Sequence, residues 1–466
     1  MRFSFCLVLL VGFQQVALAQ VTGSPKTLEA KRDSKSVEGA RKNVAKEVGS
    51  KLVAAEFNHS KYYPPTQVPD RIALTFSGDP ATSISVVWRT SELQSEPRVE
   101  FAVATSGTEF VTKTRTMLAT TEKLDFRIAD SYYHTATMSD LLPNTQYLYR
   151  VGDGSKFSEW SEFKTAKKND ESFSFVYFGD AQNAIKASWS RVVRRGMRDL
   201  PNASFFLHAG DLINSSNSDT EWGEWFYAAG WINRSIPIVA IPGNHEYGKG
   251  GLSRHWKPGF EFPKNGPEGM QDSVYYFDYQ GARFIALDTN REIEKQAKWL
   301  DVVLENNKSN WTILTGHHPF YSPAKKRNNP KLREMFEPVF KKHRIDLCLQ
   351  GHDHSYSRTF QTELKKDIDA SVAAKHVKNG TVFAVSVSGP KMYAVDKKTV
   401  MQRVAEGTQL YQLITVEKNK ISYKALTATG ELYDAFELIR EGENVTIVDQ
   451  TPSTPERRFN NINFGK

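Results

Sequence analysis

The alternation of hydrophobic and polar positions changes along the chain and divides it into segments. Residues 20–62 are polar without a sustained apolar face, which predicts a flexible leader, although a helix is compatible with residues 37–55. Residues 63–166 carry short alternating runs, such as Ser83–Trp88 and Gln146–Val151, that are separated by turn residues. Runs of this length and spacing predict a β-sandwich of about seven strands.

Beyond residue 172 the pattern becomes that of an α/β domain, in which short apolar runs alternate with longer amphipathic stretches. The stretches that predict helices are Ala187–Leu200, Arg291–Asn307 and Pro330–Arg344. Near its end the chain returns to strands, and Tyr411–Val416 and Ile421–Ala425 flank a turn and predict a hairpin. We therefore expect an α/β domain over residues 172–438, followed by a C-terminal tail over residues 439–466.

The first residues have the features of a secretory signal peptide. Arg2 gives a positive start, Phe3–Phe13 is apolar, and Ala17-Leu18-Ala19 provides a small-residue cleavage site before Gln20. The apolar run is too short for a membrane span, which needs about 20 residues, and no later segment is long enough. The sequence therefore predicts a signal peptide over residues 1–19, no membrane span, and a secreted or periplasmic protein.

Composition and charge are ordinary for a folded protein. Hydrophobic residues make up 39% of the chain and aromatic residues 12%, which is enough for a substantial core. The formal net charge of +8 is concentrated in the leader and the C-terminal tail, so the body of the chain is near neutral. We therefore expect no nucleic acid partner. The sequence gives no indication of the oligomeric state.

Five apolar runs of the second domain end in the same way, with a glycine followed at once by a potential metal ligand. The five junctions are Gly179-Asp180, Gly210-Asp211, Gly243-Asn244-His245-Glu246, Gly316-His317-His318 and Gly351-His352-Asp353-His354. A buried strand delivers the chain to the carboxyl edge of a sheet, where a glycine permits a sharp turn. Five such junctions would gather carboxylate, amide and imidazole side chains in one cleft.

The chemistry of these side chains favours a site for two metal ions. Carboxylates, an amide oxygen and imidazoles together suit manganese, iron or zinc better than calcium or magnesium. The set is large enough for two ions that share one bridging carboxylate, an arrangement that serves phosphate esters. Each motif alone is common, so the prediction depends on five of them following apolar runs in order.

The motif order GD, GD, GNHE, GHHP and GHDH resembles that of the calcineurin-like metallophosphoesterases. In the preceding β-rich segment, Leu141–Tyr147 is similar to the tyrosine-corner region of fibronectin type III domains, and Trp88 would be a core tryptophan. The chain as a whole, over residues 63–438, resembles the purple acid phosphatases most. The resemblance implies a fibronectin III-like β-sandwich followed by an α/β metallophosphoesterase domain, a two-sheet sandwich flanked by helices with a dimetal site at one edge.

The resemblance also implies a role for each residue of the motifs. The implied ligands are Asp211 as the bridge between the ions, Asp180 and His354 at the first ion, and Asn244, His317 and His352 at the second. His245 matches the histidine that assists the phosphoryl group or the leaving oxygen. His317 matches the ligand because the family's histidine stands two places before the proline, which places His318 behind it.

Two positions depart from the purple acid phosphatase pattern. Asn214 stands where the family has the tyrosine whose phenolate binds iron(III), so an Fe(III)-tyrosinate is not expected. Gln182 stands where related enzymes have a glycine or a histidine ligand, and it either binds the first ion or forms a hydrogen bond with a metal-bound water. With one negative charge fewer at the first site, we expect two divalent ions, iron, manganese or zinc.

The resemblance implies a metal-dependent phosphatase that acts on small phosphorylated substrates. Phosphate monoesters would be cleaved by attack of a metal-bound hydroxide. The same dimetal core would also serve a phosphodiesterase, and a third alternative is a binding or adhesion protein whose site has decayed. Residues considered as substrate contacts are Asn214, His255, Tyr321 and Lys325.

Overall fold

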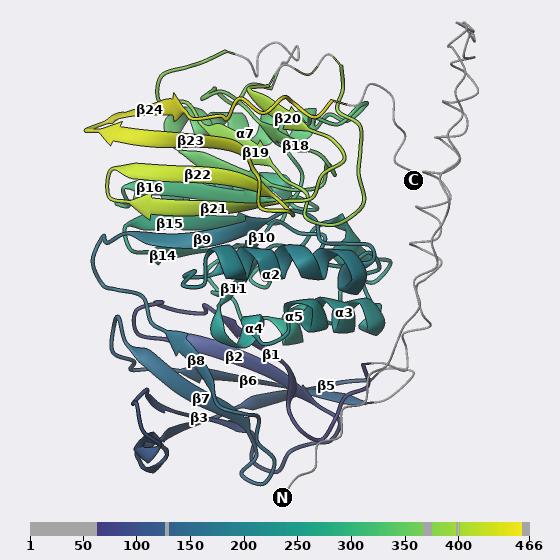
Figure 1. The fold of residues 1–466 in the computed structure, drawn as a ribbon, viewed down its shortest axis with the longest axis vertical. Helices are drawn as coiled ribbons and strands as arrows, with labels where there is room; N and C mark the ends of the chain where they lie inside the picture. The colour runs from purple at the N-terminus through teal and green to yellow at the C-terminus, as the bar shows by residue number, and fades with distance from the viewer. Residues whose placement is uncertain (1–62, 126–129, 367–374, 398, 400, 459–466) are drawn as a thin grey trace, which may run out of the picture.

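The structure is a computed structural model of the chain, and it describes residues 63–125, 130–366, 375–397, 399 and 401–458. The predicted signal peptide, the leader and the helix considered at residues 37–55 lie outside the described residues. Figure 1 shows the described chain as two parts, with the first strands at the bottom and the second domain above them. No helix of the described part combines the length and the apolar character needed to cross a membrane.

The N-terminal part is built from two antiparallel sheets. In one, the strand order is β1 (Asp70–Thr75), β2 (Ile84–Thr90), β6 (Ser131–Met138) and β5 (Thr120–Leu124). In the other, it is β4 (Arg115–Leu118), β3 (Arg98–Val103), β7 (Gln146–Gly152) and β8 (Ser161–Lys164). A short 3-10 helix, η2 (Glu109–Lys113), precedes β4. The predicted β-rich domain is confirmed.

The number of strands in this part differs from the seven expected. Residues 115–124 form two short strands, and Ala119 separates them. β4 pairs with β3 in one sheet, whereas β5 pairs with β6 in the other. Both are mostly exposed and polar, so they lack the apolar alternation that identifies a half-buried strand.

The aromatic residues singled out in the sequence lie in the core of this part. Trp88 is fully buried and stacks on His134, with 5.2 Å between ring centroids. Tyr147 stacks on Phe163, and its hydroxyl accepts a hydrogen bond of 2.8 Å from the backbone N–H of Leu142. This contact ties the loop before β7 to the core. The fibronectin type III assignment itself stays a prediction.

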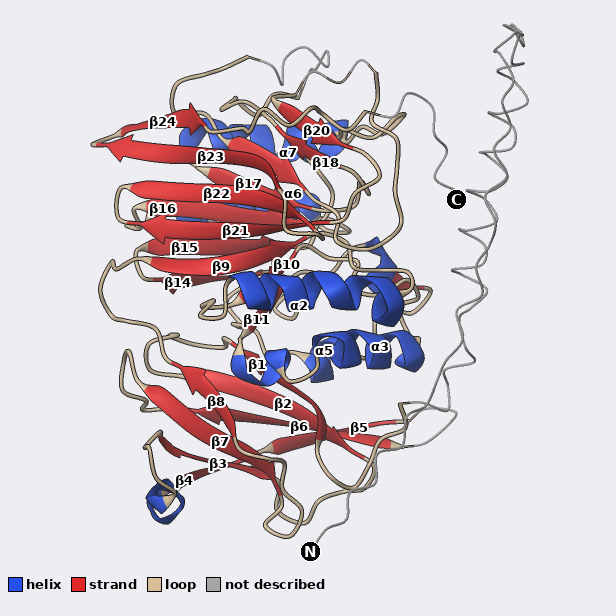
Figure 2. Cartoon of the chain, viewed as in Figure 1, coloured by secondary structure: helices blue, strands red, loops and turns tan. Residues whose placement is uncertain are grey.

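The second part is a sandwich of two sheets with helices on the outside, as Figure 2 shows. One sheet contains β24, β23, β22, β21, β9, β10 and β11 in that order, and the other contains β14, β15, β16, β17, β19, β18 and β20. The strands of the first are β9 (Phe173–Phe178), β10 (Phe206–His208), β11 (Ile238–Ala240), β21 (Leu410–Glu417), β22 (Lys420–Thr427), β23 (Leu432–Glu441) and β24 (Asn444–Asp449). Those of the second are β14 (Tyr275–Tyr279), β15 (Ala282–Leu287), β16 (Trp311–Gly316), β17 (Leu347–Gln350), β18 (Tyr356–Arg358), β19 (Val382–Val385) and β20 (Arg403–Ala405).

Aromatic side chains fill the space between the two sheets. Phe175 of β9 and Phe284 of β15 meet edge to face at 5.4 Å, and Phe205 stacks on Phe175 at 4.9 Å. These rings are buried, and burying a large apolar side chain stabilises a fold by about 1.5–3 kcal/mol. A second apolar cluster, which includes Leu300 and Phe336, joins the other face of the β15 sheet to the helices behind it.

The three predicted helices are confirmed. They appear as η3 (Ile185–Trp189) with α2 (Ser190–Asp199), as α6 (Ile293–Glu305) and as α7 (Pro330–Lys342). The structure adds α3 (Asp219–Ala229), α4 (Ile232–Ser235), α5 (Trp256–Gly259), the single turn η4 (Asn244–Glu246) and the hairpin of β12 (Tyr247–Gly248) with β13 (Gly251–Leu252). In α3 the buried positions are nearly continuous from Trp222 to Ala229, so no helical period marks it in the sequence.

The C-terminal end of the domain lies beyond residue 438, where the tail was expected to begin. β21 and β22 form the predicted hairpin, and β23 continues to Glu441. β24 then pairs antiparallel with β23 from Phe436↔Asp449 to Glu441↔Asn444. Residues 439–449 are therefore part of the sheet. The sequence did not reveal β24 because its six residues are largely exposed at the sheet edge.

The two parts are joined by a shared sheet and by ion pairs. β1 of the N-terminal part pairs in parallel with β11 at Thr75↔Ile238, so that one eleven-stranded sheet runs through both. The guanidinium of Arg71, on β1, lies 2.7 Å from the carboxylate of Asp219 at the start of α3. The N-terminal part is thus fixed against the helices that lead to the candidate site.

Candidate metal centre

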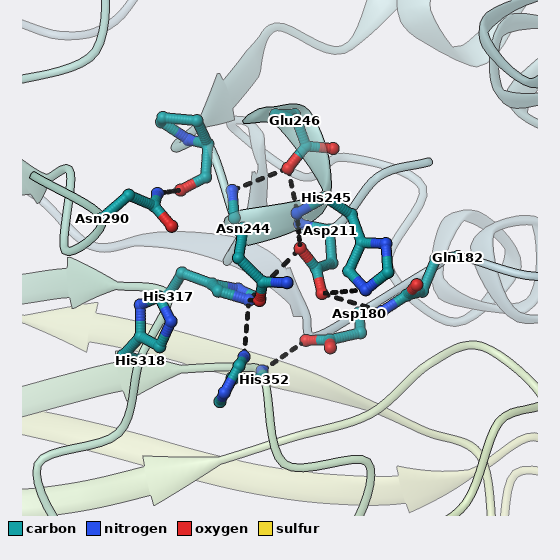
Figure 3. Close-up of polar contacts among 12 residues, drawn as sticks. Asp180, Gln182, Asp211, Asn244, His245, Glu246, Asn290, His317, His318 and His352 are labelled. Atoms are coloured by element: carbon teal, nitrogen blue, oxygen red, sulfur yellow. Dashed lines mark hydrogen bonds and ion pairs between the residues drawn. The ribbon is translucent and has the colours of Figure 1, made fainter. Parts of the chain in front are cut away.

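All five predicted junctions follow strands that end at one edge of the sandwich. β9, β10 and β11 are parallel neighbours in one sheet, and β16 and β17 are parallel neighbours in the other. The carboxyl ends of parallel strands meet at the same edge, so the residues that follow them converge. Figure 3 shows Asp180, Asp211, Asn244, His317 and His352 pointing toward one another there.

Glycine is required at these junctions because the backbone of one approaches the side chains of another. A Cβ atom at Gly243 would lie 2.1 Å from Oδ1 of Asp211, and one at Gly351 would lie 2.3 Å from Oδ1 of Asp180. Asp211 and His352 themselves have φ angles of 51° and 71°, a region that non-glycine residues rarely adopt. Strained backbone of this kind is concentrated at functional sites.

A first group of ligand atoms comes from Asp180, Asp211 and His354, all buried, and these atoms lie within 4.8 Å of one another. Nδ1 of His354 donates to the carbonyl of Lys391 at 3.1 Å. Its Nε2 therefore carries the lone pair, and it lies 3.4 Å from Oδ2 of Asp180. The tautomer that the surrounding backbone selects is the one that a metal ligand needs.

A second group comes from Asp211, His317 and His352, whose ligand atoms also lie within 4.8 Å of one another. Nδ1 of His317 donates to the carbonyl of Ala209 at 2.8 Å, which leaves Nε2 free to bind. This Nε2 lies 3.2 Å from Oδ1 of Asn244 and 3.2 Å from Nδ1 of His352. The two groups share Asp211, as two ions with one bridging carboxylate require.

The side chain of Gln182 lies beside the first group of ligand atoms, whereas the side chain of Asn214 is hydrogen-bonded to Asn183. The amide nitrogen of Gln182 lies 2.7 Å from Oδ2 of Asp211 and 3.1 Å from Nε2 of His354. The side-chain oxygen of Asn214 instead accepts a hydrogen bond of 3.1 Å from Asn183. The side chain that replaces the family's tyrosine is thus bonded to another loop.

His245 lies beside the two groups, and its ring is about a quarter exposed. Its backbone N–H donates to Oδ1 of Asp211 at 2.9 Å, and its Nδ1 donates to the carbonyl of Asn214 at 2.6 Å. Nε2 therefore faces the site, 4.0 Å from Oδ2 of Asp211, with 26% of the side chain exposed. This ring is placed to exchange a proton with a molecule at the centre.

Glu246 is a buried residue of the site for which the sequence alone predicts no role. Its carboxylate accepts hydrogen bonds from the backbone N–H groups of Gly243, Asp211, Leu212 and Ile213, at 2.6, 2.9, 2.8 and 3.3 Å. It therefore joins the junction after β11 to the junction after β10, which carries Asp211. The signal was present as the last residue of the GNHE motif, but three of its four partners, Asp211, Leu212 and Ile213, lie more than 30 positions away.

The electrostatics of the centre favour cations. Burial, and to a lesser degree the Asp211 carboxylate, raises the pKa of Asp180. Burial opposes a charge on His317, yet the carboxylates of Asp211 and Asp180 raise its pKa to about 10. A protonated imidazole there supplies positive charge that bound metal ions would supply instead. Among the described residues, the buried Oδ2 of Asp180 and Oε1 of Gln182 have no hydrogen-bond partner, so the donor set fits metal ions.

The other residues considered from the sequence are not all accessible. His318 bonds to Thr289 through Nδ1 and packs against the ring of His352 at 4.3 Å, so it lies behind that ligand. His255 and Tyr321 are 2% and 4% exposed, which excludes them as substrate contacts. Of the remaining two, Asn214 contributes its carbonyl to His245, and Lys325 is exposed.

Two protein families match the chain, one for each part. Residues 69–165 match the N-terminal domain of purple acid phosphatases, and residues 173–356 match the calcineurin-like phosphoesterases. The second match contains all five junctions. The predicted family resemblance is therefore confirmed, as is the order of a β-rich domain and a metallophosphoesterase domain.

Individual relatives and solved structures agree with this match. Acid phosphatase type 7 from Homo sapiens is 28% identical over 328 residues, which cover 63% of this chain and 71% of that protein. A probable inactive purple acid phosphatase from Arabidopsis thaliana is 24% identical over 312 residues, covering 55% of this chain and 49% of that protein. The structure of a purple acid phosphatase from yellow lupin seeds has the same fold, with a TM-score of 0.67 at 20% identity, over 80% of this chain and 75% of that one.

Proposed function

Because this chain belongs to the purple acid phosphatase-like members of the calcineurin-like metallophosphoesterases, we propose that it is a metal-dependent phosphatase that hydrolyses phosphate monoesters. The observation that carries the proposal is the sharing of Asp211 between two groups of ligand atoms. Two ligand sets with a common carboxylate suit phosphoryl transfer, because two neighbouring ions can stabilise both the attacking and the leaving oxygen. The substrate would be a small phosphorylated molecule.

In this proposal the ligands are divided as the two groups of atoms suggest. Asp180, Asp211 and His354 would hold the first ion together with the neighbouring Gln182, and Asp211, His317 and His352 would hold the second together with the neighbouring Asn244. Two bound divalent ions would hold the phosphoryl oxygens and acidify a water molecule for attack on phosphorus. Glu246 keeps Asp211 in place through the backbone N–H groups around it.

His245 is the residue that we propose to assist the leaving oxygen. Its Nδ1–H is committed to the carbonyl of Asn214, so a second proton can only be held at Nε2. Nε2 faces the centre, where it would donate that proton to the leaving oxygen or stabilise charge on the phosphoryl group. No covalent intermediate with the protein is needed for this reaction.

The first site is proposed to hold a divalent ion rather than iron(III). Its ligands include two carboxylates, Asp180 and Asp211, and no phenolate, because Asn214 replaces the family's tyrosine and is bonded to Asn183. The amide nitrogen of Gln182 now lies beside Asp211. Rotation of the amide group would bring its oxygen, which is neutral, to that position at the first site. Iron, manganese and zinc in the divalent state suit this set.

The active protein is therefore expected to be colourless and to contain divalent ions. Purple colour in the family arises from charge transfer between a phenolate and iron(III), and the side chain at position 214 provides no phenolate. The measurement is a visible absorption spectrum of the active protein together with its metal content. An intense visible band in that spectrum would contradict the proposed first site.

Activity toward a monoester is expected to exceed activity toward a diester in a direct comparison. The experiment assays 4-nitrophenyl phosphate and bis(4-nitrophenyl) phosphate before and after removal of metal with a chelator, and again after manganese, iron or zinc is added. Loss and recovery of monoester hydrolysis would support the proposal. Greater activity on the diester would favour a phosphodiesterase, and a preparation that stays inactive and metal-free would favour a binding protein.

A further inference from the structure

The loop that orients His245 is itself held by a glutamate from the next helix. We propose that Glu221 is the positioning residue for His245, and that the N-terminal domain anchors Glu221 through Asp219. The proposal rests on the proposed function because it assumes that His245 assists catalysis. Its structural part concerns the histidine ring alone and can be measured without substrate.

One peptide group, between Asn214 and Ser215, lies between the side chains of Glu221 and His245. The carbonyl of Asn214 accepts the Nδ1–H of His245 at 2.6 Å, and the N–H of the same peptide group, on Ser215, donates to Oε2 of Glu221 at 2.7 Å. The C=O and N–H of a trans peptide point in opposite directions, so this group connects the two side chains. Oε2 of Glu221 also accepts the N–H of Asn214 at 2.7 Å.

A carboxylate at this place does two things for the imidazole. It fixes the plane of the 214–215 peptide, and hence the direction in which the Asn214 carbonyl points. It also polarises that peptide, because hydrogen bonds in a chain strengthen one another and a charged acceptor makes the stronger bond. Both effects favour the ring orientation that turns Nε2 of His245 toward the centre.

Glu221 lies in the first turn of α3. Ser218 caps this helix, and its side chain accepts a hydrogen bond of 3.3 Å from the N–H of Glu221. The neighbouring Trp222 donates from its indole to the carbonyl of Ser216 at 3.0 Å. The start of α3 and the loop before it therefore form one hydrogen-bonded unit with His245.

Asp219, the first residue of α3, joins this hydrogen-bonded unit to the N-terminal domain. Arg71 of β1 contacts the Asp219 carboxylate at 2.7 Å and donates to its backbone carbonyl at 3.0 Å, and Arg89 of β2 lies 3.5 Å from the carboxylate. Burial opposes ionisation of Asp219, yet the two guanidinium groups hold its pKa below the usual range. Figure 1 shows α3 between the N-terminal strands and α2.

The consequence is a role for the N-terminal domain in the reaction. It contributes no side chain to either group of metal-ligand atoms in the described structure. It does hold the helix start from which Glu221 reaches the loop of His245. Within this chain the first domain is therefore a support for one catalytic group, rather than a separate adhesion module.

The test replaces Glu221 and observes the His245 ring directly. In protein labelled with 15N at histidine, the Nδ1–H of His245 is identified by its loss in His245→Ala and is expected far downfield because of its strong hydrogen bond. In Glu221→Ala this signal should move upfield or be lost, and in Glu221→Gln it should move less, because one acceptor oxygen remains. An unchanged signal in both variants overturns the proposal, whatever the activity.

A kinetic experiment compares esters with different leaving groups, because protonation by a general acid accelerates hydrolysis most when the oxygen is a poor leaving group. We expect Glu221→Ala to lower kcat about 10-fold on an alkyl phosphate and less than about 3-fold on 4-nitrophenyl phosphate, with unchanged metal content. Added to His245→Ala, it should cause no further loss. Equal losses on both esters, or a full additional loss in the double variant, would overturn the role of Glu221.

The control and the anchor are tested in the same assays. Glu294→Ala removes a glutamate from the first turn of α6, where it pairs with Lys298, and should leave both the His245 signal and the rates unchanged. Asp219→Asn should shift the signal and the ester ratio in the same direction as Glu221→Ala, by a smaller amount. If Asp219→Asn changes neither, anchoring by the N-terminal domain is overturned.

Discussion

Replacing Asp211 with alanine is expected to abolish hydrolysis and to lower the content of both metal ions. Its carboxylate belongs to both groups of ligand atoms, so no other single side chain can take its place. It also accepts hydrogen bonds from the backbone of His245 and from Gln182, which would both lose their acceptor. The measurements are metal analysis of the purified variant and initial rates on a phosphate monoester.

A thermal unfolding experiment separates this loss of metal from a failure to fold. Ligands that bind the native state raise its unfolding temperature, so manganese or zinc should stabilise the parent protein but not the Asp211 variant. Asp272→Ala, which removes a partly exposed carboxylate paired with Lys264, serves as the control and should behave like the parent. Two metal ions retained per chain in Asp211→Ala would refute the assignment of the bridge.

Replacing His245 with alanine should have nearly as large an effect on rate while leaving the metal ions in place. The ring belongs to neither group of ligand atoms, and its Nε2 lies 4.0 Å from the nearer oxygen of Asp211. Removing one group that donates a proton or stabilises charge costs roughly 100- to 10,000-fold in rate. The measurement is kcat on a monoester, together with metal content.

The control for this variant is His343, a largely buried histidine outside the candidate site whose ring is bonded to a carboxylate. His343 contacts Asp301 at 2.6 Å between α7 and the amino end of β17, whereas the candidate site lies at the carboxyl ends of the strands, and His343→Ala should keep the parent's activity. If His245→Ala lost metal together with activity, His245 would be a ligand rather than an acid. If it kept full activity on both alkyl and aryl esters, the proposed role would be wrong.

The sequence alone determined the strands and the junctions that carry the candidate site. Each junction is a local pattern, an apolar run followed by glycine and a ligand, and its conformation depends on residues that are adjacent in the chain. The same holds for α6, where Ala297, Leu300 and Leu304 recur on the buried face. Short-range periodicity and turn chemistry are enough to predict elements of this kind.

Elements without such a local pattern appeared only in the structure. β24 is largely exposed, so its sequence lacks the alternation of apolar and polar residues that marks a half-buried strand. α3 is buried around most of its circumference, so its sequence lacks the apolar stripe of an amphipathic helix. The pairing of β1 with β11 joins Thr75 to Ile238 across 163 positions, and no spacing in the sequence encodes it. Contacts of this range depend on how whole sheets pack.

The roles of the supporting residues were likewise decided by tertiary structure. Nothing in the sequence indicates a partner for Glu246, the last residue of the GNHE motif, or for Glu221, yet each accepts backbone hydrogen bonds from the loop that begins at Asp211. Their carboxylates act on groups brought near by folding, and so does the carbonyl of Ala209 that selects the tautomer of His317. The sequence predicted which side chains are candidate metal ligands; only the packed structure determined how the surrounding backbone holds and orients them, because those hydrogen bonds join residues that are distant in the chain.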